Sequence, residues 1–318
     1  EMLQVLETRL FPINQLLPLA SKRSAGKRVR FRGKYLTIHE LTRSSFDKID
    51  IAIFSAGGDI SKKFAPLAVK AGAVVVDNSS AFRMDKNVPL IVPEINGSDT
   101  DNHKGIIANP TCTTAITLMA LYPLHKAFGV KRMFASTYQA VSGTGAEAIS
   151  ELDRQIEQTV NGKADEIKTK INPHQIAFNA LPFVESFAEG QYTTEEWKMV
   201  YETRKILHEP NLPVSATCVR VPVYNSHGES VNVELTEPMN PIRARDILSS
   251  SPGIVVQDDP EIDLYPLPIN SSGTDDVFVG RIREDISHPN GLVLWVVADN
   301  LRKGAALNTI QIAEVIAG

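Results

Sequence analysis

The sequence predicts an α/β domain built on a doubly wound parallel sheet, followed by an α+β domain with a mixed, largely antiparallel sheet. Three observations support this. The 318 residues amount to about two domains of ordinary size. In the first third, short and continuously apolar runs alternate with helical patterns, which is typical of a parallel sheet covered by helices. Further along, apolar and polar residues alternate, as they do in half-exposed antiparallel strands.

Three buried strands are expected in the first domain, at 50–58, 73–77 and 105–109. Helical patterns follow at 60–71 and 113–128. In a parallel sheet of this kind, ligands bind at the carboxyl ends of the strands. Small or polar residues occupy those ends, at 55–58, 78–80 and 109–112. The first domain is therefore predicted to be of the Rossmann type, which binds dinucleotides.

The second domain is expected to have strands with one exposed face. Alternating runs predict such antiparallel strands at 214–223, 229–235, 276–283 and 292–298. Helical patterns lie at 145–159, 194–207 and 241–249, and an amphipathic helix at 303–316 closes the chain.

The chain opens inside a helical pattern, with Met2, Leu3, Val5, Leu6 and Leu10 on one side. Neither a strand nor an N-cap residue precedes this helix. We therefore expect that an upstream segment is missing from the sequence, and we leave open whether a targeting peptide belongs to it.

Composition and charge exclude several classes of protein. Hydrophobic residues make up 43% and charged residues 22%, which excludes a disordered chain. The net charge of −4 offers no basic surplus for a nucleic-acid backbone or a membrane surface. No apolar run approaches the ~18 residues of a membrane span. Only two cysteines occur, so neither a disulfide framework nor a four-thiolate zinc site is expected. The pattern indicates a soluble protein of a reducing compartment.

Cys112 is the first candidate for chemistry. Pro110 closes the third strand and a helix begins near Thr113, which places the thiol at a helix N-terminus. The partial positive charge there is expected to lower the pKa of the thiol. A nucleophile and a buried small hydrophobe are about equally good interpretations of such a residue. Cys218 lies inside an alternating strand and is interpreted as structural.

Three further features indicate binding or acid–base roles. A basic loop at 21–27 lies where a dinucleotide fold reads the adenosine ribose, although such loops are usually only solvated. His227 lies at a turn beside a strand, seven residues after Arg220. Arg220 itself lies within an apolar strand, where burial is costly without an anionic partner. It is either paired within the protein or available for a ligand carboxylate.

Motifs along the whole chain match one enzyme family in order. They are ASKRSAGK (20–27), IAIFSAGG (51–58), VVVDNSSAFRM (74–84), VPLIVPEIN (88–96), NPTCTT (109–114), STYQAVSGTG (136–145), IAFNALP (176–182), EEWKMVYETRKI (195–206), SATCVRVPV (215–223), FVGRIRED (278–285) and WVVADNLRKGAALNTIQIAE (295–314). On these motifs the sequence closely resembles the aspartate-β-semialdehyde dehydrogenases.

The resemblance implies an oxidoreductase (EC 1.2.1.11) that reduces L-aspartyl-4-phosphate to L-aspartate-4-semialdehyde with NADP as cofactor. This reaction serves lysine, threonine and methionine biosynthesis. Cys112 would be the nucleophile that carries a thioester, and Gln139 would orient the substrate beside it. His227 would be the general acid/base, a role that a near-neutral pKa suits.

The resemblance also implies how the substrate is held. Arg220 would bind its α-carboxylate and Glu195 its ammonium group. Arg83 and Lys198 would bind phosphate. These charges are complementary to the groups that they would meet, and no metal is implied.

Cofactor contacts are implied at a further set of positions. The 2′-phosphate of NADP would meet Arg23 and Ser24. The other contacts would be Ser55, Ala56 and Gly57 on the adenosine side, Asn78 and Ser79 further along, and Ser142, Gly143 and Asn300 at the nicotinamide. The implied domains are 1–109 with 300–318 for NADP binding, and 110–299 for catalysis and dimerisation. A homodimer or homotetramer is expected, in the cytoplasm, or in the plastid stroma if a transit peptide exists.

The chain departs from the family pattern in two places. The family begins with a strand and a glycine-rich loop that presents backbone N–H groups to the pyrophosphate, and both are absent before Glu1. The residue before the nucleophile is usually Asn, and here it is Thr111. Two alternatives remain: an N-acetyl-γ-glutamyl-phosphate reductase, whose substrate carries no charged amine for Glu195, and a non-catalytic homologue.

Overall fold

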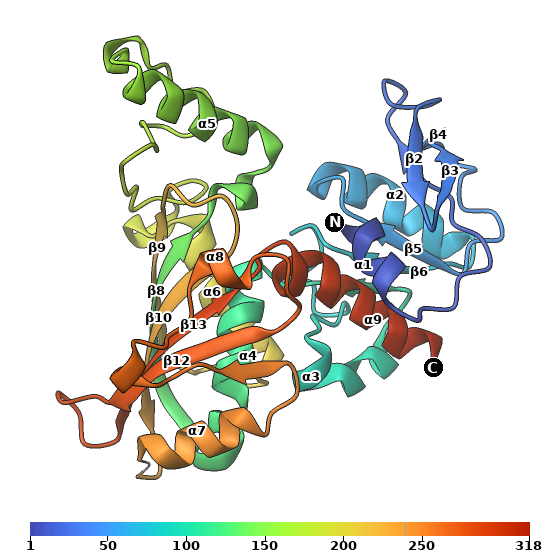
Figure 1. The fold of residues 1–318 in the computed structure, drawn as a ribbon. Coiled ribbons are helices and arrows are strands. Elements are labelled where there is room, and N and C mark those ends of the chain that lie inside the picture. Colours follow the sequence, from blue (N-terminus) through green and yellow to red (C-terminus); the bar gives the residue numbers. More distant parts are fainter. Residues whose placement is uncertain (239) are drawn as a thin grey trace. The chain divides into compact units, whose positions relative to one another are not determined.

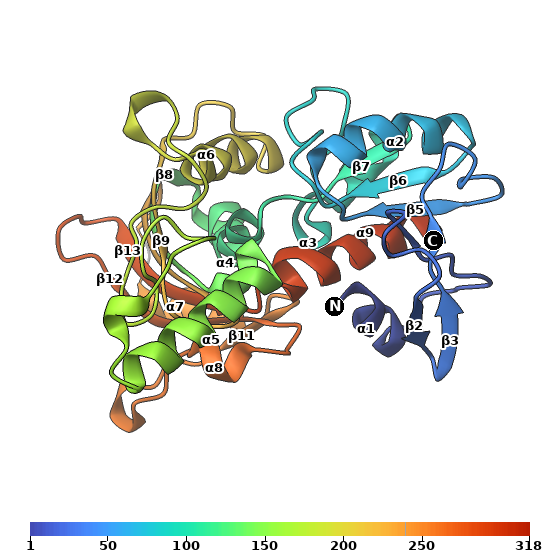
Figure 2. The ribbon, with the colours of Figure 1, turned by 90° about the horizontal axis from the view of Figure 1, so that it is seen from above.

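The computed structural model describes residues 1–238 and 240–318, and the chain divides into two units. Unit 1 comprises Glu1–Pro110 and Ala305–Gly318, and unit 2 comprises Thr111–Gly304. Each unit has its own sheets and its own buried clusters, and each can be followed by itself in Figures 1 and 2. The chain passes between the units twice, after Pro110 and after Gly304.

Unit 1 is centred on the three-stranded parallel sheet that the sequence predicts. Strands β5 (Ile51–Phe54), β6 (Val74–Asp77) and β7 (Ile106–Ala108) pair in this order, each parallel to the next. α2 (Gly58–Lys70) links β5 to β6, and α9 (Leu307–Ala317) packs against buried strand residues from the far end of the sequence (Figure 1). Because parallel strands end at the same edge, the segments after the three strands lie together there.

Residues 19–40 of unit 1 form short ribbons that the sequence analysis does not predict. β1 (Leu19–Ala20) pairs in parallel with β4 (His39–Glu40), and β2 (Arg28–Phe31) forms a hairpin with β3 (Lys34–Thr37). The hairpin loop is Arg32-Gly33, with φ of 46° and 77°, as a type I′ turn requires. Two short helical elements precede β7: α3 (Pro93–Asn96) and the 3-10 helix η1 (Gly97–Asn102).

The opening helix is shorter than its sequence pattern. α1 spans Met2–Thr8, with Val5 and Leu6 buried. Arg9 is extended, at φ −101° and ψ 150°, and Leu10 beyond it is fully exposed. The prediction that Leu10 shares the buried side of this helix is wrong, because the helix ends before it.

Unit 2 is built on a six-stranded mixed sheet with the order β11-β12-β13-β10-β8-β9. Its strands are β8 (Val130–Gln139), β9 (Val214–Arg220), β10 (His227–Leu235), β11 (Ile254–Val256), β12 (Val277–Glu284) and β13 (Gly291–Ala298). Three of the pairings are antiparallel, and β8–β9 and β11–β12 are parallel. The predicted mixed, largely antiparallel sheet is confirmed. The antiparallel assignment of the strand at 214–223 is wrong, because its partner β8 runs parallel to it.

Helices cover one face of this sheet. α4 (Cys112–Phe128) lies against β8, β10 and β13, α6 (Thr194–Ile206) against β9, and α7 (Pro241–Ser249) against β11 and β12. The other face carries exposed aromatic side chains, among them Phe134 and Tyr138. α5 (Ala146–Val160) projects from the sheet with the loop that follows it and has a small core of its own (Figure 1). The one-turn helix α8 (Pro268–Ser271) precedes β12.

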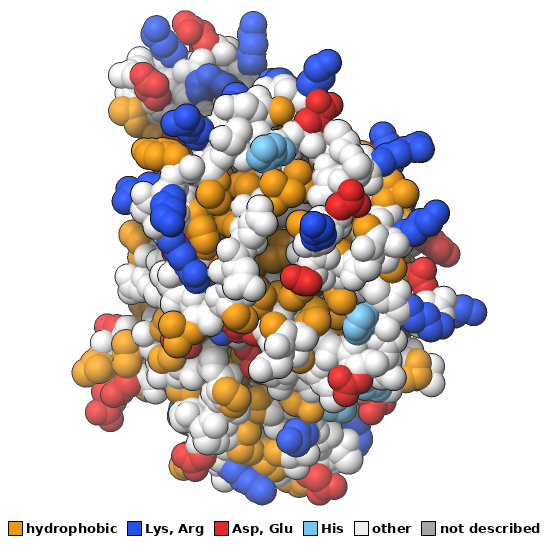
Figure 3. Space-filling model, turned by 90° about the vertical axis from the view of Figure 1, so that its right-hand side faces the viewer, with side chains coloured by type: hydrophobic (Ala, Val, Ile, Leu, Met, Phe, Trp, Pro, Cys, Tyr) orange, Lys and Arg blue, Asp and Glu red, His pale blue; other side chains and the backbone are white. Residues whose placement is uncertain are grey.

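No helix among the described residues is long and apolar enough to cross a membrane. On the face drawn in Figure 3, Lys and Arg side chains are interspersed with Asp and Glu side chains. Such a mixed surface agrees with the small net charge of the sequence.

Candidate active site

Cys112 is the first residue of α4, and Thr111 is the N-cap. Its Sγ atom lies 3.4 Å from Nε2 of His227, the first residue of β10. His227 is fully buried, whereas Cys112 is partly exposed. The structure therefore joins the two residues that the sequence analysis proposes for chemistry, although 115 positions separate them.

The pKa of the Cys112 thiol is raised to about 12. Burial is the main cause, and the carboxylate of Glu195 and then Glu229 add to it. Arg220 and a hydrogen bond from the backbone of Thr113 act in the opposite direction but are outweighed. The prediction of a lowered thiol pKa at the helix N-terminus is therefore wrong, because burial and nearby carboxylates outweigh the helix terminus.

His227 is held by the backbone of the loop that follows β8. Its Nδ1 accepts a hydrogen bond from the backbone N–H of Ala140 at 3.0 Å. Burial and then the nearby Arg220 hold the pKa of His227 well below its ordinary value, against a weaker opposite contribution from the Ser226 backbone. The near-neutral pKa expected from the sequence is therefore wrong, and at neutral pH the ring is uncharged.

Glu195 of α6 gathers donors beside the nucleophile. Its Oε1 accepts hydrogen bonds from Nε2 of Gln139 at 2.9 Å and from the hydroxyl of Thr113 at 3.2 Å. Its Oε2 lies 3.4 Å from Nζ of Lys198, which also contacts Glu185. The Oε1 atom of Gln139 is buried and has no hydrogen-bond partner among the described residues. Two acceptors, one anionic and one neutral, thus lie side by side.

Arg220 ends β9 and is almost entirely buried. Its Nη1 donates to the carbonyl oxygen of Ala140 at 2.7 Å. Within the described part of the chain, no carboxylate lies within ion-pair distance of it. Of the two interpretations that the sequence leaves open, the structure favours a guanidinium available to an external carboxylate, because burial without an anionic partner is costly.

Glu202 is a site residue that the sequence analysis does not identify. It lies on α6 two turns after Glu195 and is 1% exposed. Its Oε2 accepts the backbone N–H of Thr111 at 2.6 Å, and its Oε1 accepts the Thr111 hydroxyl at 3.1 Å. Both oxygens of the Glu202 carboxylate thus hold Thr111, the residue before the nucleophile. The hydroxyl of this threonine supplies one of the two hydrogen bonds.

Ser142, Gly143 and Asn300 lie around the entrance to β10. Asn300 and Ser142 exchange hydrogen bonds through their side chains, at 3.0 and 3.2 Å, and Oδ1 of Asn300 accepts the N–H of Ser226 at 2.9 Å. A Cβ atom on Gly143 would lie 3.2 Å from Nη1 of Arg220 and 3.5 Å from Nε2 of His227. These residues therefore lie next to the Cys112–His227 pair.

Gly304 also lies against the nucleophile. A Cβ atom at this position would come within 2.6 Å of Cβ of Cys112. The segment approaches so closely that only glycine fits there. Residues 302–306 form a π-helical turn (Arg302–Ala306), so that α9 begins four residues later than the sequence pattern indicates.

Glu229 is a buried acid beneath the pair, on the strand that begins with His227. It receives a short hydrogen bond from the Thr117 hydroxyl, and its Oε1 has no partner among the described residues. Burial raises the pKa of Glu229 well above its ordinary value, and Glu195 adds to the effect. Burial therefore favours the protonated form of this carboxyl group.

The remaining predicted site residues belong to unit 1, at the carboxyl edge of its parallel sheet. Ser55, Ala56 and Gly57 follow β5 and are exposed, and Gly57, at φ 91°, is the N-cap of α2. Asn78 follows β6 and donates through Nδ2 to Oγ of Ser55 at 3.4 Å. Ser79 uses its hydroxyl and its N–H to hold buried Asp77.

Three basic or polar positions of unit 1 complete the predicted set. Arg23 and Ser24 lie in the turn after β1, and Arg23 is exposed. Arg83 is 8% exposed and donates to the carbonyl oxygen of Asn78 at 3.1 Å. Arg83 belongs to a different unit from Lys198, its predicted partner in phosphate binding.

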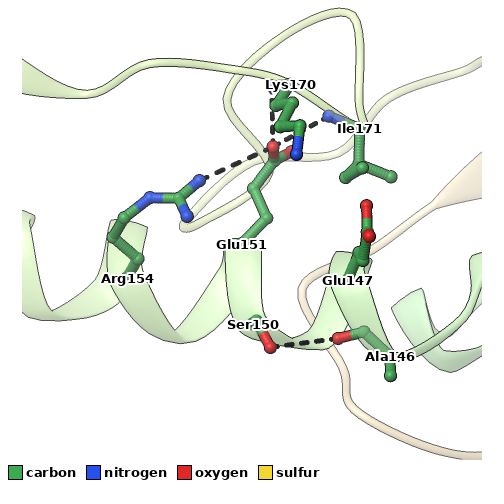
Figure 4. A pocket seen from close by; sticks show the side chains of 7 residues that line it. All are labelled: Ala146, Glu147, Ser150, Glu151, Arg154, Lys170 and Ile171. Atoms are coloured by element: carbon green, nitrogen blue, oxygen red, sulfur yellow. Dashed lines mark hydrogen bonds and ion pairs between the residues drawn. The ribbon is translucent and has the colours of Figure 1, made fainter. Parts of the chain in front are cut away.

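One pocket of unit 2 lies apart from these residues. It measures about 310 Å³ and is lined by α5 and by Lys170 and Ile171 (Figure 4). On its wall, the carboxylate of Glu151 accepts the N–H groups of Lys170, Ile171 and Asn172 at 2.7, 2.8 and 3.0 Å, and Arg154 lies 3.7 Å away. No sequence-predicted site residue lines this pocket. The described residues contain no group of three or more His, Cys, Asp or Glu that could hold a metal ion.

Two family models match the chain. Residues 1–103 match the NAD binding domain of semialdehyde dehydrogenases, and residues 121–303 match their dimerisation domain. With the Rossmann-type sheet of unit 1 and the mixed sheet of unit 2, these matches define an oxidoreductase of the semialdehyde dehydrogenase class.

Similar proteins narrow the class. The chain is 52% identical to the aspartate-semialdehyde dehydrogenase of Aquifex aeolicus (strain VF5), over 99% of this chain and 93% of that protein. The crystal structure of aspartate semialdehyde dehydrogenase II complexed with ASA from Vibrio cholerae matches with a TM-score of 0.96 and 44% identity, over 99% and 94% of the two chains. That of the Candida albicans enzyme with NADP matches with a TM-score of 0.75 and 25% identity, over 99% and 94%. The chain belongs to the aspartate-semialdehyde dehydrogenase family.

Proposed function

We propose that this enzyme reduces L-aspartyl-4-phosphate to L-aspartate-4-semialdehyde with NADPH, through a thioester on Cys112, for lysine, threonine and methionine biosynthesis. The observation that carries the proposal is the contact of 3.4 Å between Sγ of Cys112 and Nε2 of His227, with a buried cation and a buried anion beside it. A thiol suits the reaction because sulfur is both a strong nucleophile and a good leaving group.

The charges around Cys112 fit the two ends of an amino acid. The guanidinium group of Arg220 can bind the α-carboxylate through two parallel hydrogen bonds, and no carboxylate of the described residues pairs with it. Glu195 and the unpartnered Oε1 of Gln139 are acceptors for the α-ammonium group. We assign the phosphate group to Lys198 and Arg83. Gln139 then orients the substrate next to the sulfur.

The edge of the parallel sheet in unit 1 fits a dinucleotide. Ser55, Ala56 and Gly57 are exposed, and the space over Gly57 is open, since a Cβ atom there would meet nothing within 4 Å. The amide of Asn78 lies beside them, and Ser79 would contribute from the same edge. When NADPH is bound, its chemistry is hydride donation. We assign its 2′-phosphate to Arg23 and Ser24, and its nicotinamide to Ser142, Gly143 and Asn300.

We further propose that the enzyme is a homodimer, or a tetramer built from dimers, and that unit 1 binds the cofactor while unit 2 provides catalysis and dimerisation. The sheet face of unit 2 opposite α4 exposes Phe134 and Tyr138, each at 41%. Trp295 packs on Tyr138 at a centroid distance of 5.6 Å. An apolar sheet face of this kind is suited to pairing with a second copy.

Two observations support a reducing compartment, the cytoplasm, as the place of action. Both cysteines are free thiols, and the Aquifex aeolicus and Vibrio cholerae proteins are bacterial. The N-acetyl-γ-glutamyl-phosphate reductase that the sequence leaves as an alternative is not favoured. Its uncharged amide would leave the buried Glu195 carboxylate without a cationic ligand.

The test is the reverse reaction, the phosphate-dependent reduction of NADP by aspartate semialdehyde. We expect turnover by the wild-type protein, dependence on phosphate, and loss of turnover in Cys112→Ser. Replacing NADP with NAD measures the contribution of Arg23 and Ser24. Turnover of the N-acetylated glutamate analogue without turnover of aspartate semialdehyde would overturn the proposal.

A further inference from the structure

Thr111 lies at the position where a helix is normally capped. It is the N-cap residue of α4, and its carbonyl oxygen accepts the N–H of Ala115 at 3.0 Å. Threonine is a common N-cap residue, because its hydroxyl oxygen can accept the N–H of the second or third residue of the helix. In α4 these residues are Thr113 and Thr114. Among the described residues, however, the Thr111 hydroxyl accepts no such capping hydrogen bond.

Glu202 explains why the hydroxyl does not cap the helix. Its Oε1 accepts the hydrogen of the Thr111 hydroxyl at 3.1 Å, and its Oε2 accepts the Thr111 N–H at 2.6 Å. Hydrogen bonds to a charged group are roughly twice as strong as bonds between neutral groups, so a carboxylate outcompetes a capping bond. Glu202 is 1% exposed and belongs to α6, which packs against α4. The hydroxyl is therefore turned toward α6 and away from the first turn of α4.

A donor of this first turn lies beside the nucleophile. The backbone N–H of Thr113 forms a hydrogen bond with the sulfur of Cys112, and this bond acts to lower the pKa of the thiol. The same N–H is one of the two that a capping hydroxyl would take. If Thr111 capped the helix, its hydroxyl oxygen would compete with the sulfur for this donor. The orientation of one hydroxyl group thus decides which atom the Thr113 N–H meets.

We propose that Glu202 is a positioning residue for Cys112: it holds the Thr111 hydroxyl away from the first turn of α4 and so leaves the Thr113 N–H to the sulfur. This inference rests on the proposed function and adds one residue to its site. Glu202 acts through Thr111 and not on the reacting atoms. Negative charge develops on sulfur when the thioester forms and again when the aldehyde leaves, and a fixed donor stabilises that charge.

The same helix also holds the residue on the other side of the nucleophile. Glu195, seven residues before Glu202 on α6, accepts the hydroxyl of Thr113 at 3.2 Å. Seven residues are about two helical turns, so both carboxylates lie on one face of α6. The residues before and after Cys112 are thus both held from α6. Because α6 also carries Glu195 and Lys198, the proposed ligands of the substrate, one helix aligns the thiol and the substrate.

The first test separates the hydrogen bonds of Glu202 from its charge. Glu202→Gln removes the charge but keeps an acceptor for the Thr111 N–H and a donor for the hydroxyl oxygen, so we expect kcat within about 10-fold of wild type. Glu202→Ala removes these hydrogen bonds and releases the hydroxyl to cap α4. Its kcat is expected to fall by about 10²-fold, near the value of two hydrogen bonds to a charged group, with KM changed by less than about 2-fold. If Glu202→Ala does not fold, Glu202→Asp, which is one methylene too short, replaces it.

Glu196→Ala is the matched control for this test. Glu196 is also buried on α6, at 6% exposed, and accepts the backbone N–H groups of Thr193 and Cys218 at 2.7 and 2.9 Å. The variant should lose stability, as Glu202→Ala does, but keep kcat close to wild type. Equal losses of kcat in Glu202→Gln and Glu202→Ala would assign the effect to charge and overturn the proposal. An unchanged kcat in Glu202→Ala, or an equal loss in Glu196→Ala, would also overturn it.

A second measurement needs no substrate. Iodoacetamide alkylates thiolates, and mass spectrometry of the digested protein reports Cys112 separately from the buried Cys218. Glu202→Gln and Glu202→Ala lack the same charge, so a difference between them reports the hydrogen bonds. At one fixed pH, we expect alkylation of Cys112 to be about 10-fold slower in Glu202→Ala, because the capping hydroxyl takes the donor from the sulfur.

Equal alkylation rates in the two variants would overturn the positioning role of Glu202. A wild-type protein that does not turn over aspartate semialdehyde would overturn the proposed function instead. The alkylation comparison would then still decide whether Glu202 controls the donor at Cys112, because it depends on no substrate.

Discussion

Two buried glutamates of unit 2 show how differently one side chain is used in two regions. Glu151 and Glu229 are exposed by 1% and 0%. Glu151 accepts three backbone N–H groups and the side-chain amide of Asn172. Burial raises its pKa, but these hydrogen bonds outweigh burial and the net pKa lies below the ordinary value. Glu229 accepts a hydrogen bond from Thr117, its Oε1 has no partner among the described residues, and burial raises its pKa well above the ordinary value.

The difference separates a structural region from a reactive one. Around Glu151, three backbone N–H groups of the loop and the side-chain amide of Asn172 all donate to one carboxylate, so charge and burial coexist and the loop is held against α5. Around Cys112, hydrogen bonds do not outweigh the effect of burial. The pKa values of the Cys112 thiol and of Glu229 are therefore raised, which favours the neutral form of both groups. The Oε1 atom of Gln139 has no hydrogen-bond partner among the described residues. Polar groups left in this condition are available to a ligand.

The largest effect is expected from Cys112→Ser, which should impair the reactive region around Cys112 and leave the region around Glu151 intact. Cys112→Ser replaces a good nucleophile and leaving group with a poor one, so turnover is expected to fall by about 10³-fold or more. The melting temperature and the affinity for NADP, measured by fluorescence titration, should change little. Turnover close to wild type would contradict the nucleophile assignment.

Glu151→Gln should destabilise the region around Glu151 and leave the reactive region around Cys112 intact. The amide offers one acceptor where the carboxylate offers two, and its NH₂ group would face backbone donors, so we expect a loss of about 2–3 kcal/mol in the free energy of unfolding. The turnover of the folded enzyme should not change. Urea unfolding measures the effect, with the exposed Glu147→Gln on the same helix as the control.

The pH dependence of this loss has a definite sign. Because the folded-state pKa of Glu151 is lowered, its stabilisation is present above the unfolded pKa of about 4.3 and disappears as the pH falls through the folded value. Wild type and Glu151→Gln should therefore converge in acid. A difference that persists unchanged there would show that the carboxylate charge is not what holds the loop.

Thr111→Val tests a smaller effect at the nucleophile. It removes the hydroxyl that donates to Glu202 and leaves the backbone donor in place. We expect kcat to fall by about 10-fold, near the value of one hydrogen bond to a charged group, with KM little changed. Thr111→Ser keeps the donor and should restore most of kcat. Equal losses in both variants would show that the hydroxyl does not position Cys112.

The smallest effect is expected for Glu229→Gln. Because the folded-state pKa is raised, wild type is destabilised as the pH rises from the unfolded pKa toward the folded one, and an uncharged glutamine is not. The variant should match wild type to within about 1 kcal/mol in mild acid and gain on it at higher pH. A large loss of stability at pH 8 would show that Glu229 is ionised and paired.

The sequence predicts the parts of the fold that have a local period. The apolar runs of β5, β6 and β7 and the long helices lie close to their predicted positions. The sequence does not predict β8, because Lys131 and Arg132 are both exposed at its start and break the alternation. The ribbons at 19–40 contain strands of two to four residues, too short for a period to be read.

Within the site, motifs locate side chains but not their surroundings. The structure brings Cys112 and His227, which the motifs locate separately, into contact. Both of their pKa predictions fail, because burial depends on packing that no local pattern encodes. No local pattern identifies Glu202 or Gly304 for the same reason: each matters only because it approaches Thr111 or Cys112 in space.

The raised pKa of Cys112 also bears on how long the enzyme survives. Peroxides and electrophiles attack thiolates far faster than thiols, and oxidation beyond the sulfenic acid is irreversible for most proteins. Although Cys112 is partly exposed, a nucleophile that rests as a neutral thiol reacts more slowly with such oxidants between turnovers. The burial and the carboxylates that raise the thiol pKa, and so make the thiolate harder to form, also protect the Sγ atom of Cys112 from oxidation.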